Sequence, residues 1–483
     1  MARLLGLETE YGLGLDGADP GQMVAESRAV VCSYSGAYAA PWDYTHECPR
    51  RDMRGYEVPG LARNPDDARY DTCGPQYTSI AEEHADRVLP NGGRLYNDHG
   101  HPEFSTPECL SLRDLIAYDR AGAEVVLDCA MRRSAELGRR VSIYRNNTDY
   151  HGASYGTHEC YLISRSTPVE VLISALGSFL ATRQIFAGAG KAAFEDPSGC
   201  SPGFQLSQRA DFITVEASVD TLFRRPLFNT RDEPHATAGS YARLHVICGD
   251  ANMSEWAGAL KVGSLALVLD AIEAGIPMPA PLRDPVRTVQ EVSRDLTFGR
   301  RYARRGAPDA TAIEVQRAYL ETAARAPGDL AEREWVLKEW SQALDDLAEA
   351  TQIGAGEFYQ VMSEALQANY PVTAGLMPWV YKRPWPVVAI QLVDGFGHPT
   401  APYYFLKRTY EPAHIQARLP HLLWTAGETV PMRAAVTYAE QAFSGPAAGR
   451  SACHPGRRCR MSNWARSGCQ RTTPTGTSSS WRS

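Results

Sequence analysis

The sequence of 483 residues predicts an α+β fold. Segments with the apolar alternation of strands and segments with helical spacing are mixed along the chain, without the regular βαβ alternation of a doubly wound sheet. A composition that is 44% hydrophobic and 22% charged is ordinary for a globular protein with a large core. The length favours more than one domain.

The first expected element is a strand at 3–15, in which alternation places Glu8 and Glu10 on one face. Residues 39–80 are rich in Pro, Gly, Asp and Arg and predict a long loop, a kind of segment that tends to be functional or disordered. Further strands are expected at 141–147, 160–165, 211–218 and 243–250, and helices at 22–38, 111–137, 168–186, 255–274 and 310–350.

Three parts of the chain differ in character. Residues 1–350 carry the mixed pattern and are expected to form the main domain, and 351–444 suggest a small C-terminal domain with short strands interrupted by Pro. Residues 445–483 are rich in Ser, Thr, Gly and Arg without periodicity, which predicts a disordered tail. This tail holds seven Arg and no Lys, Asp or Glu, so without it 42 basic residues face 56 acidic ones.

The charge and the cysteines narrow the class of protein. A net charge of −7 gives no case for a nucleic-acid partner, and an acidic main body is compatible with divalent metal sites. The N-terminal apolar run is too short for a signal peptide, and no apolar run is long enough for a membrane span. Eleven cysteines without CxxC spacing favour free thiols in a reducing cytoplasm.

Titratable groups are dense in "GRLYNDHGHPEFSTPE", residues 93–108. Tyr96 and Asp98 share a face of a strand, and Glu103 follows the break at Gly100–Pro102. Paired carboxylates suit hard divalent cations, but an exposed charged loop would look the same. Glu8 and Glu10 can likewise be a metal-binding pair or two exposed carboxylates on the polar face of a strand.

Further clusters follow at expected strand ends, in "NNTDYHGASYGTHECY", "FNTRDEPHA" and "RLHVICGDANM". Arg231 has the forked guanidinium that suits phosphate oxygens, although an ion-pair network would also use it. No Walker, Rossmann, GxSxG or HExxH motif is present. Nucleotide binding would therefore need a carboxylate–metal site.

Taken together and in this order, these segments resemble the Pup ligase and Pup deamidase/depupylase family, relatives of glutamine synthetase. Pup is the prokaryotic ubiquitin-like protein. The resemblance covers about residues 3–348 and implies a curved antiparallel sheet that binds ATP and Mg²⁺ and receives the Pup C-terminus. It implies Pup and pupylated proteins as partners, and neither nucleic acid nor membrane.

The resemblance also implies roles for individual residues. Asp98 falls on the catalytic aspartate, and Arg94, Thr106 and Arg231 fall on positions near the nucleotide. The positions expected to hold metal, with the active-site histidines, are Glu8, Glu10, Tyr96, Glu103, His158 and His245.

"WDYTHECPRRDMRGY" at 42–56 resembles the extra loop of the deamidase/depupylase branch. That branch uses ATP and Mg²⁺ to convert the C-terminal Gln of Pup to Glu and to cleave Pup–lysine isopeptide bonds. The alternatives are an ATP-consuming ligase acting through an acyl-phosphate and a non-catalytic Pup-binding protein. Departures from the family pattern are Asn97, Cys160 and the region after about 350, where Trp379, Trp385 and Trp424 cannot be assigned.

Overall fold

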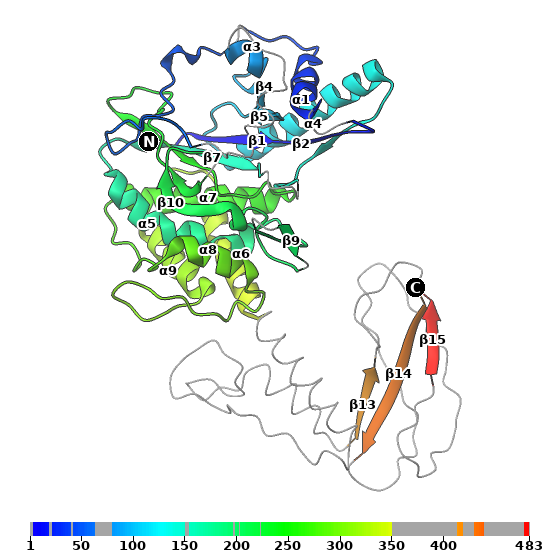
Figure 1. Ribbon diagram of the computed structural model, residues 1–483. Helices are drawn as coiled ribbons and strands as arrows, with labels where there is room; N and C mark the ends of the chain where they lie inside the picture. The colour runs from blue at the N-terminus through cyan, green and yellow to red at the C-terminus, as the bar shows by residue number, and fades with distance from the viewer. Residues whose placement is uncertain are drawn as a thin grey trace. The chain divides into compact units, whose positions relative to one another are not determined.

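The computed structural model describes most of the first 349 residues and three later strands. The described residues are 3–18, 22–39, 42–62, 80–149, 154–196, 199–201, 203–222, 224–349, 413–418, 429–438 and 478–482. Contacts divide the chain into two units, Met1–Ala348 and Glu349–Ser483 (Figure 1). The expected strands at 379–410 and the three unassigned tryptophans lie outside the described residues.

The first unit is built on an eight-stranded sheet with the order β10-β11-β12-β7-β1-β5-β4-β3. Neighbouring strands are antiparallel except β10 and β11, which run parallel. The expected antiparallel sheet is confirmed apart from this one pair. The strands are β1 (Leu5–Glu10), β3 (Arg87–Val88), β4 (Arg94–Asp98), β5 (His101–Ser105), β7 (Thr157–Ser164), β10 (Ile213–Ser218), β11 (Arg225–Asn229) and β12 (Tyr241–Val246).

Smaller elements complete the unit, and the α+β class is confirmed. Two further sheets pair β2 (Gly12–Leu15) with β6 (Val141–Tyr144) and β8 (Phe194–Asp196) with β9 (Gly199–Ser201). The helices are α1 (Met23–Cys32), α3 (Ile80–His84), α4 (Leu112–Leu137), α5 (Val169–Thr182), α6 (Gln184–Ala187), α7 (Glu255–Glu273), α8 (Pro285–Arg294), α9 (Ala312–Arg325) and a helix at 333–349.

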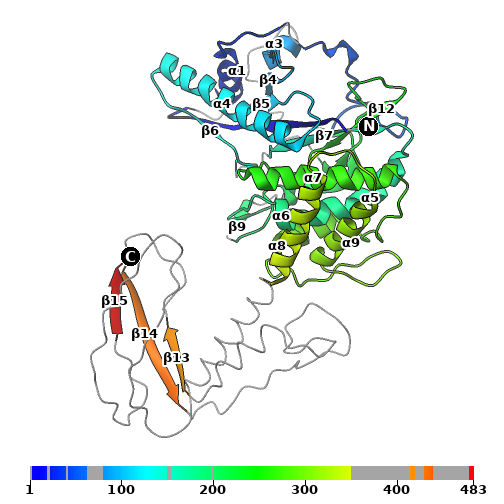
Figure 2. The same cartoon turned by 180° about the vertical axis from the view of Figure 1, so that it is seen from behind.

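Alternation gives the large sheet two different faces. One face carries buried apolar side chains such as Leu7, Phe104 and Leu244, which pack under the helices, and it is called the helix face here. Figure 2 shows α4 and α7 on the side of the sheet that is turned toward the viewer. The residues between these positions point to the opposite face, called the polar face, which carries Glu8, Glu10, Tyr96, Asp98, Glu103, His158 and His245.

Most expected elements exist, with shifted ends. The long helix at 111–137 is confirmed as α4, which begins at the Ser111 cap and ends before Gly138 in a left-handed conformation. The expected strand at 3–15 divides at Tyr11 into β1 and β2, and the expected helix at 22–38 ends at Cys32. The kinked segment at 93–108 is a β4–β5 hairpin, because the chain reverses at His99–Gly100.

The second unit contains a three-stranded antiparallel sheet in the order β13-β14-β15. Its strands are β13 (Ala413–Arg418), β14 (Thr429–Tyr438) and β15 (Ser478–Arg482). β15 lies within 445–483, where the sequence predicts no order, and residues 445–477 lie outside the described part. The division at 350 and 444 stays a prediction. No helix in the described residues is long and apolar enough to span a membrane.

Candidate metal and catalytic site

The pairing register brings the predicted site residues together across five strands, β4, β5, β1, β7 and β12. Glu103 lies opposite Tyr96 on β4 and opposite Glu10 on β1. Glu8 lies opposite His158 on β7, and one strand further His245 lies opposite Cys160. Residues directly opposite each other share a face of the sheet, so these strands place all of these side chains on the polar face.

Three carboxylates form the first cluster. Glu10, Asp98 and Glu103 each have an oxygen within 4.8 Å of the other two. Glu103 is 1% exposed, and its burial, together with the charges of Asp98 and Glu10, raises its pKa well above its usual value. Three acidic groups in one buried space repel each other, and a divalent cation with oxygen ligands relieves that repulsion.

Tyr96 supports this cluster through Glu103. Its hydroxyl donates a hydrogen bond to the Glu103 Oε1 at 2.5 Å. Burial and the charge of Glu103 raise the pKa of Tyr96 well above its usual value, so the phenol keeps its proton. Tyr96 thereby fixes the orientation of Glu103 and has its own oxygen beside any ion that Glu103 binds.

Glu8, His158 and His245 form the second cluster, again with ligand atoms within 4.8 Å of one another. The His245 Nε2 lies 3.2 Å from Glu8 Oε2, and the His158 Nδ1 lies 3.7 Å from the same oxygen. Burial lowers the pKa of His245 to about 3, so the ring is neutral at physiological pH. A neutral imidazole beside a carboxylate is a metal-ligand set.

Ring nitrogens of His158 and His245 without hydrogen bonds support the interpretation of this cluster as a metal site. His158 and His245 are about 7% and 6% exposed, and no hydrogen bond is made by His158 Nε2 or by either ring nitrogen of His245 within the described part of the chain. His158 Nε2 lies 3.5 Å from Glu10 Oε2 and so lies between the two clusters. Buried polar atoms without partners are costly unless a ligand satisfies them.

Asp98 has a different neighbour, His99. The His99 Nδ1 lies 2.9 Å from the Asp98 Oδ2. Burial alone would raise the pKa of Asp98, but the contact with His99 outweighs it and lowers that pKa below its usual value. The charge of Asp98 in turn raises the pKa of His99. Asp98 is therefore ionised and available as a nucleophile or base.

The three residues predicted near a nucleotide occupy different settings. Arg94 forms an ion pair with Asp86 at 2.6 Å, and its guanidinium lies 3.9 Å from the centre of the Tyr96 ring. The Thr106 hydroxyl accepts a hydrogen bond from the Leu7 N–H at 3.1 Å, so it ties β5 to β1. Arg94 thus contacts Tyr96, which supports the carboxylate cluster, whereas Thr106 braces the strands.

Arg231 is held by the predicted loop. Its guanidinium donates to the Val219 carbonyl at 2.8 Å, and burial lowers its pKa. Within the described loop residues 42–62, the Met53 N–H donates to the Thr230 carbonyl at 2.8 Å, and the Arg51 carbonyl accepts from the Asp232 N–H at 2.8 Å. The loop therefore pairs with the backbone on both sides of Arg231.

The sequence-based predictions missed several residues of the polar face. Arg243 donates to Glu8 at 3.0 Å and, because His245 is neutral, supplies the cation that holds the pKa of Glu8 well below its usual value even though burial would raise it. Cys160 lies 3.4 Å from Glu8. The same period-two alternation that selected Glu8 and Glu10 could have found both, since Arg243 precedes His245 by two residues and Cys160 follows His158 by two.

The structure also shows where Arg209 and Asn97 lie relative to the carboxylate cluster. Arg209 is buried, and its side chain lies close enough to Gly156 that any Cβ there would collide with it. The Gly156 N–H donates to Glu10, so Arg209 lies beside the first cluster. Asn97, which departs from the family pattern, lies on the helix face and not beside the carboxylates.

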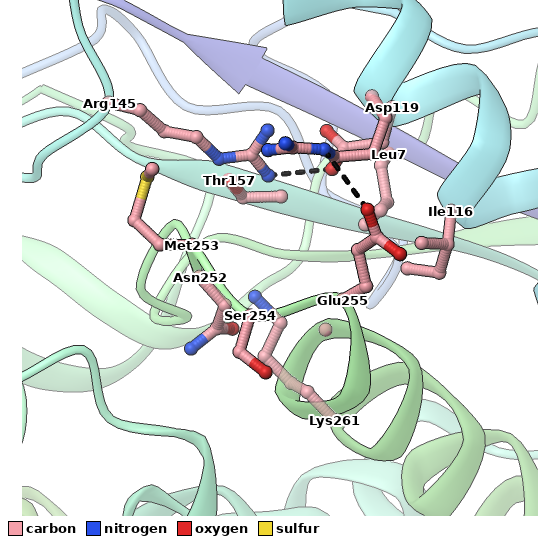
Figure 3. Close-up of a pocket in the computed structure, with 12 residues that line it drawn as sticks. Leu7, Ile116, Asp119, Arg145, Thr157, Asn252, Met253, Ser254, Glu255 and Lys261 are labelled. Carbon is pink, nitrogen blue, oxygen red and sulfur yellow. Dashed lines mark hydrogen bonds and ion pairs between the residues drawn. The ribbon is translucent and has the colours of Figure 1, made fainter. Parts of the chain in front are cut away.

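A small cavity on the helix face is unrelated to this site. It has a volume of about 10 Å³, room for about one water molecule, between α4 and α7 (Figure 3). Leu7 and Thr157 line it, and both alternate with residues of the polar face. Asp119 accepts from Arg145 at 2.6 Å at its edge. A cavity of this size cannot hold a substrate.

Comparison with known proteins places the chain in a family. The Pup-ligase protein family matches residues 3–361. The chain is 39% identical to a depupylase of Acidothermus cellulolyticus, covering 83% of this chain and 79% of the relative. It is 40% identical to a Pup deamidase/depupylase of Mycolicibacterium smegmatis, covering 71% and 70%.

A solved structure is similar as well. The Pup ligase PafA in complex with ADP superposes with a TM-score of 0.50 at 36% identity, over 60% of this chain and 66% of that one. A relative aligned to 83% of the chain extends past residue 350, so the expected end of the resemblance near 348 is too early. The family match over most of the chain shows that this protein belongs to the Pup-ligase protein family.

Proposed function

We propose that this protein hydrolyses amide bonds at the C-terminus of Pup. It converts the C-terminal Gln of Pup to Glu and releases Pup from the lysines of pupylated proteins, and it acts on neither nucleic acids nor membranes. The observation that carries the proposal is an ionised Asp98 within 4.8 Å of Glu10 and Glu103, on a sheet face where His158 Nε2 and both ring nitrogens of His245 make no hydrogen bond within the described residues. The names of the two relatives support the substrate and the direction of the reaction.

We propose Mg²⁺ and ATP as cofactors. Glu10, Tyr96 and Glu103 offer oxygen ligands to one ion, and Glu8, His158 and His245 offer a second set. Bound Mg²⁺ would polarise the scissile carbonyl and balance the charge of phosphates. Arg94, Thr106 and Arg231 are the proposed nucleotide contacts, and the ADP bound to the related ligase supports a nucleotide in this fold.

Asp98 carries the chemistry in this proposal. Either its free oxygen attacks the amide carbon of the Pup side chain, giving an acyl group that water then opens, or it takes a proton from a water that attacks the same carbon. In both cases the carbon–nitrogen bond breaks and ammonia or the lysine amine leaves with a proton. In the first case water hydrolyses the anhydride of Asp98 and the Pup side chain, and in the second the oxygen of water enters the new carboxylate directly. His158 lies 3.5 Å from Glu10, and Arg209 interacts with the charge of Glu10, so both lie near the first cluster and would stabilise negative charge on the carbonyl oxygen.

A second candidate function is an ATP-consuming ligase, which joins a carboxylate to an amine through an acyl-phosphate. The ligase remains a candidate because the similar solved structure is a Pup ligase bound to ADP. The same cluster could serve it, since positioning a phosphate and a carboxylate needs the same cations. The predicted loop favours the hydrolase, because 42–56 resembles the extra loop of that branch.

We propose the cytoplasm as the compartment. Free thiols suit a reducing environment. The cysteines described as free are Cys32, Cys48, Cys109, Cys129, Cys160 and Cys248.

The test is incubation of the full chain with ATP, Mg²⁺ and either Pup ending in Gln or a Pup–protein conjugate. Ammonia from the first substrate and free Pup from the second support the hydrolase. ADP formed together with a new amide bond favours the ligase. Binding of Pup without any product shows a non-catalytic protein.

A further inference from the structure

The turn of the β4–β5 hairpin has an unusual residue. His99 and Gly100 are its two central residues, with φ values of 47° and 87°. Two-residue turns with both φ values positive favour Asn, Asp or Gly at the first position, and other side chains adopt this conformation at a cost. The turn alone does not explain a histidine at 99.

Packing does not explain it either. The side chain of His99 is 50% exposed. His101, two residues further, gives a contrast, because it packs on Tyr155 with ring centres 4.4 Å apart. In this hairpin His101 therefore has a packing role, and His99 does not.

What His99 does contact is Asp98. The Nδ1–Oδ2 distance is 2.9 Å, and no other side chain in the described part of the chain makes a hydrogen bond or ion pair with Asp98. The carboxylates of Glu10 and Glu103 lie close by and repel it, and His84 and His158 act on it only through their charge and at longer range. Within the described residues, the one direct side-chain contact that can orient Asp98 is thus made from the positive-φ position of the turn.

We propose that His99 is a positioning residue for Asp98. Its Nδ1–H holds the Oδ2 atom and leaves Oδ1 directed at the substrate amide. A donor at this position is enough, because Nδ1 carries a proton in the imidazolium ion and in one neutral tautomer. The inference rests on the proposed role of Asp98 in amide hydrolysis.

Two variants at 99 separate the donor from the turn. His99→Gly keeps the positive φ and removes the donor. His99→Asn also tolerates a positive φ, and its Nδ2–H group lies close to the place of the imidazole Nδ1–H. The pair is matched in backbone conformation, so a difference between the two variants reports on the contact with Asp98.

Steady-state hydrolysis of a Pup conjugate is the readout, with nucleotide affinity as the measure of an intact site. We expect His99→Gly to lower kcat by roughly 10- to 100-fold, the loss typical of a misplaced reacting group, with KM and nucleotide Kd within about twofold. His99→Asn should stay within about threefold of the wild-type kcat. A kcat for His99→Gly close to wild type, or equal losses in both variants, overturns the proposal.

A measurement without substrate separates this inference from the proposed function. The ¹⁵N shift of His99 Nδ1 in selectively labelled protein should indicate a protonated Nδ1 and should change in Asp98→Asn. An Nδ1 signal that is indifferent to Asp98 overturns the positioning role. A signal that depends on Asp98, in a protein that cleaves no Pup substrate, upholds the contact and rejects the proposed function.

Discussion

Two buried acidic groups, on β7 and β5, lie on opposite faces of the same sheet and differ in how their charge is compensated. On the helix face, Glu159 is fully buried, Arg183 binds it through two nitrogens at 2.9 and 2.5 Å, and the Tyr161 hydroxyl donates at 2.6 Å. On the polar face, Glu103 accepts one bond from Tyr96 and otherwise meets other carboxylates.

The opposite pKa shifts express this difference. Burial alone would raise the pKa of Glu159, but Arg183 outweighs it and the pKa is lowered. The pKa of Glu103 is raised, because nothing outweighs its burial and the acidic neighbours. Compensated burial indicates a structural role, and uncompensated burial in a cluster indicates a ligand site. Substitutions on the helix face should therefore cost stability, and those on the polar face should cost function.

The largest expected effect is on catalysis, from Asp98→Asn on the polar face. The amide cannot attack or take a proton, so turnover of a Pup conjugate should fall by at least about 10⁴-fold. Nucleotide binding and the unfolding midpoint should stay near wild type, because the helix face is untouched. Near-normal turnover of this variant would show that Asp98 is not the catalytic group.

The next effect is on stability, from Arg183→Met on the helix face. Glu159 keeps its charge in a buried space without its cation, which should lower the free energy of unfolding by about 3–5 kcal/mol. Denaturant titration measures this. Adding Glu159→Leu should recover most of the loss, since an apolar pair replaces the ion pair.

The matched control is Arg132→Met. Arg132 pairs with Asp128 at 2.7 Å on the exposed side of α4. Solvent screens this pair, so its loss should leave the unfolding curve unchanged. A loss of stability as small for Arg183→Met as for Arg132→Met would contradict the structural reading of the helix face.

A third effect depends on pH and concerns Lys261, which lines the cavity on the helix face. Burial lowers its pKa from 10.5 to about 8. Between these values the unfolded chain holds the proton that the folded chain has released, so stability rises with pH. Relative to Lys261→Met, the wild type should gain about 3 kcal/mol from pH 8 to pH 10.5, at 1.36 kcal/mol for each pKa unit. A pH-independent difference would reject a buried, neutralised lysine.

The smallest expected effect is on stability, from Glu103→Gln on the polar face. Glu103→Gln keeps an acceptor for Tyr96 and removes one of the three mutually repelling charges. Without metal its stability should equal or exceed that of the wild type. Saturating Mg²⁺ should stabilise the wild type by about 2–3 kcal/mol at roughly 100 times the Kd, and the variant by far less. Equal stabilisation of both by Mg²⁺ would remove Glu103 from the ligand set.

Much of this arrangement could be predicted from local pattern. Period-two alternation placed Glu8 and Glu10 on one face, and their register with β5 and β7 agrees. The spacing of apolar residues predicted α4 almost to the residue. Both signals come from neighbours in sequence, which is why they could be read without the fold.

The rest depends on contacts between distant segments. Arg183 follows Glu159 by 24 residues and reaches it only because α5 packs on the helix face. The contact of His99 with Asp98 follows from a turn in which both central φ values are positive. The parallel pairing of β10 with β11 likewise has no local signature.

The most direct test of the central claim, that the polar face hydrolyses Pup amide bonds, is the number of amide bonds cleaved for each ATP consumed. The wild-type protein with Mg²⁺ and excess Pup conjugate should release many Pup molecules for each ADP formed, and Asp98→Asn should release none. One ADP for each new Pup–protein bond would contradict the account and assign the same residues to a ligase.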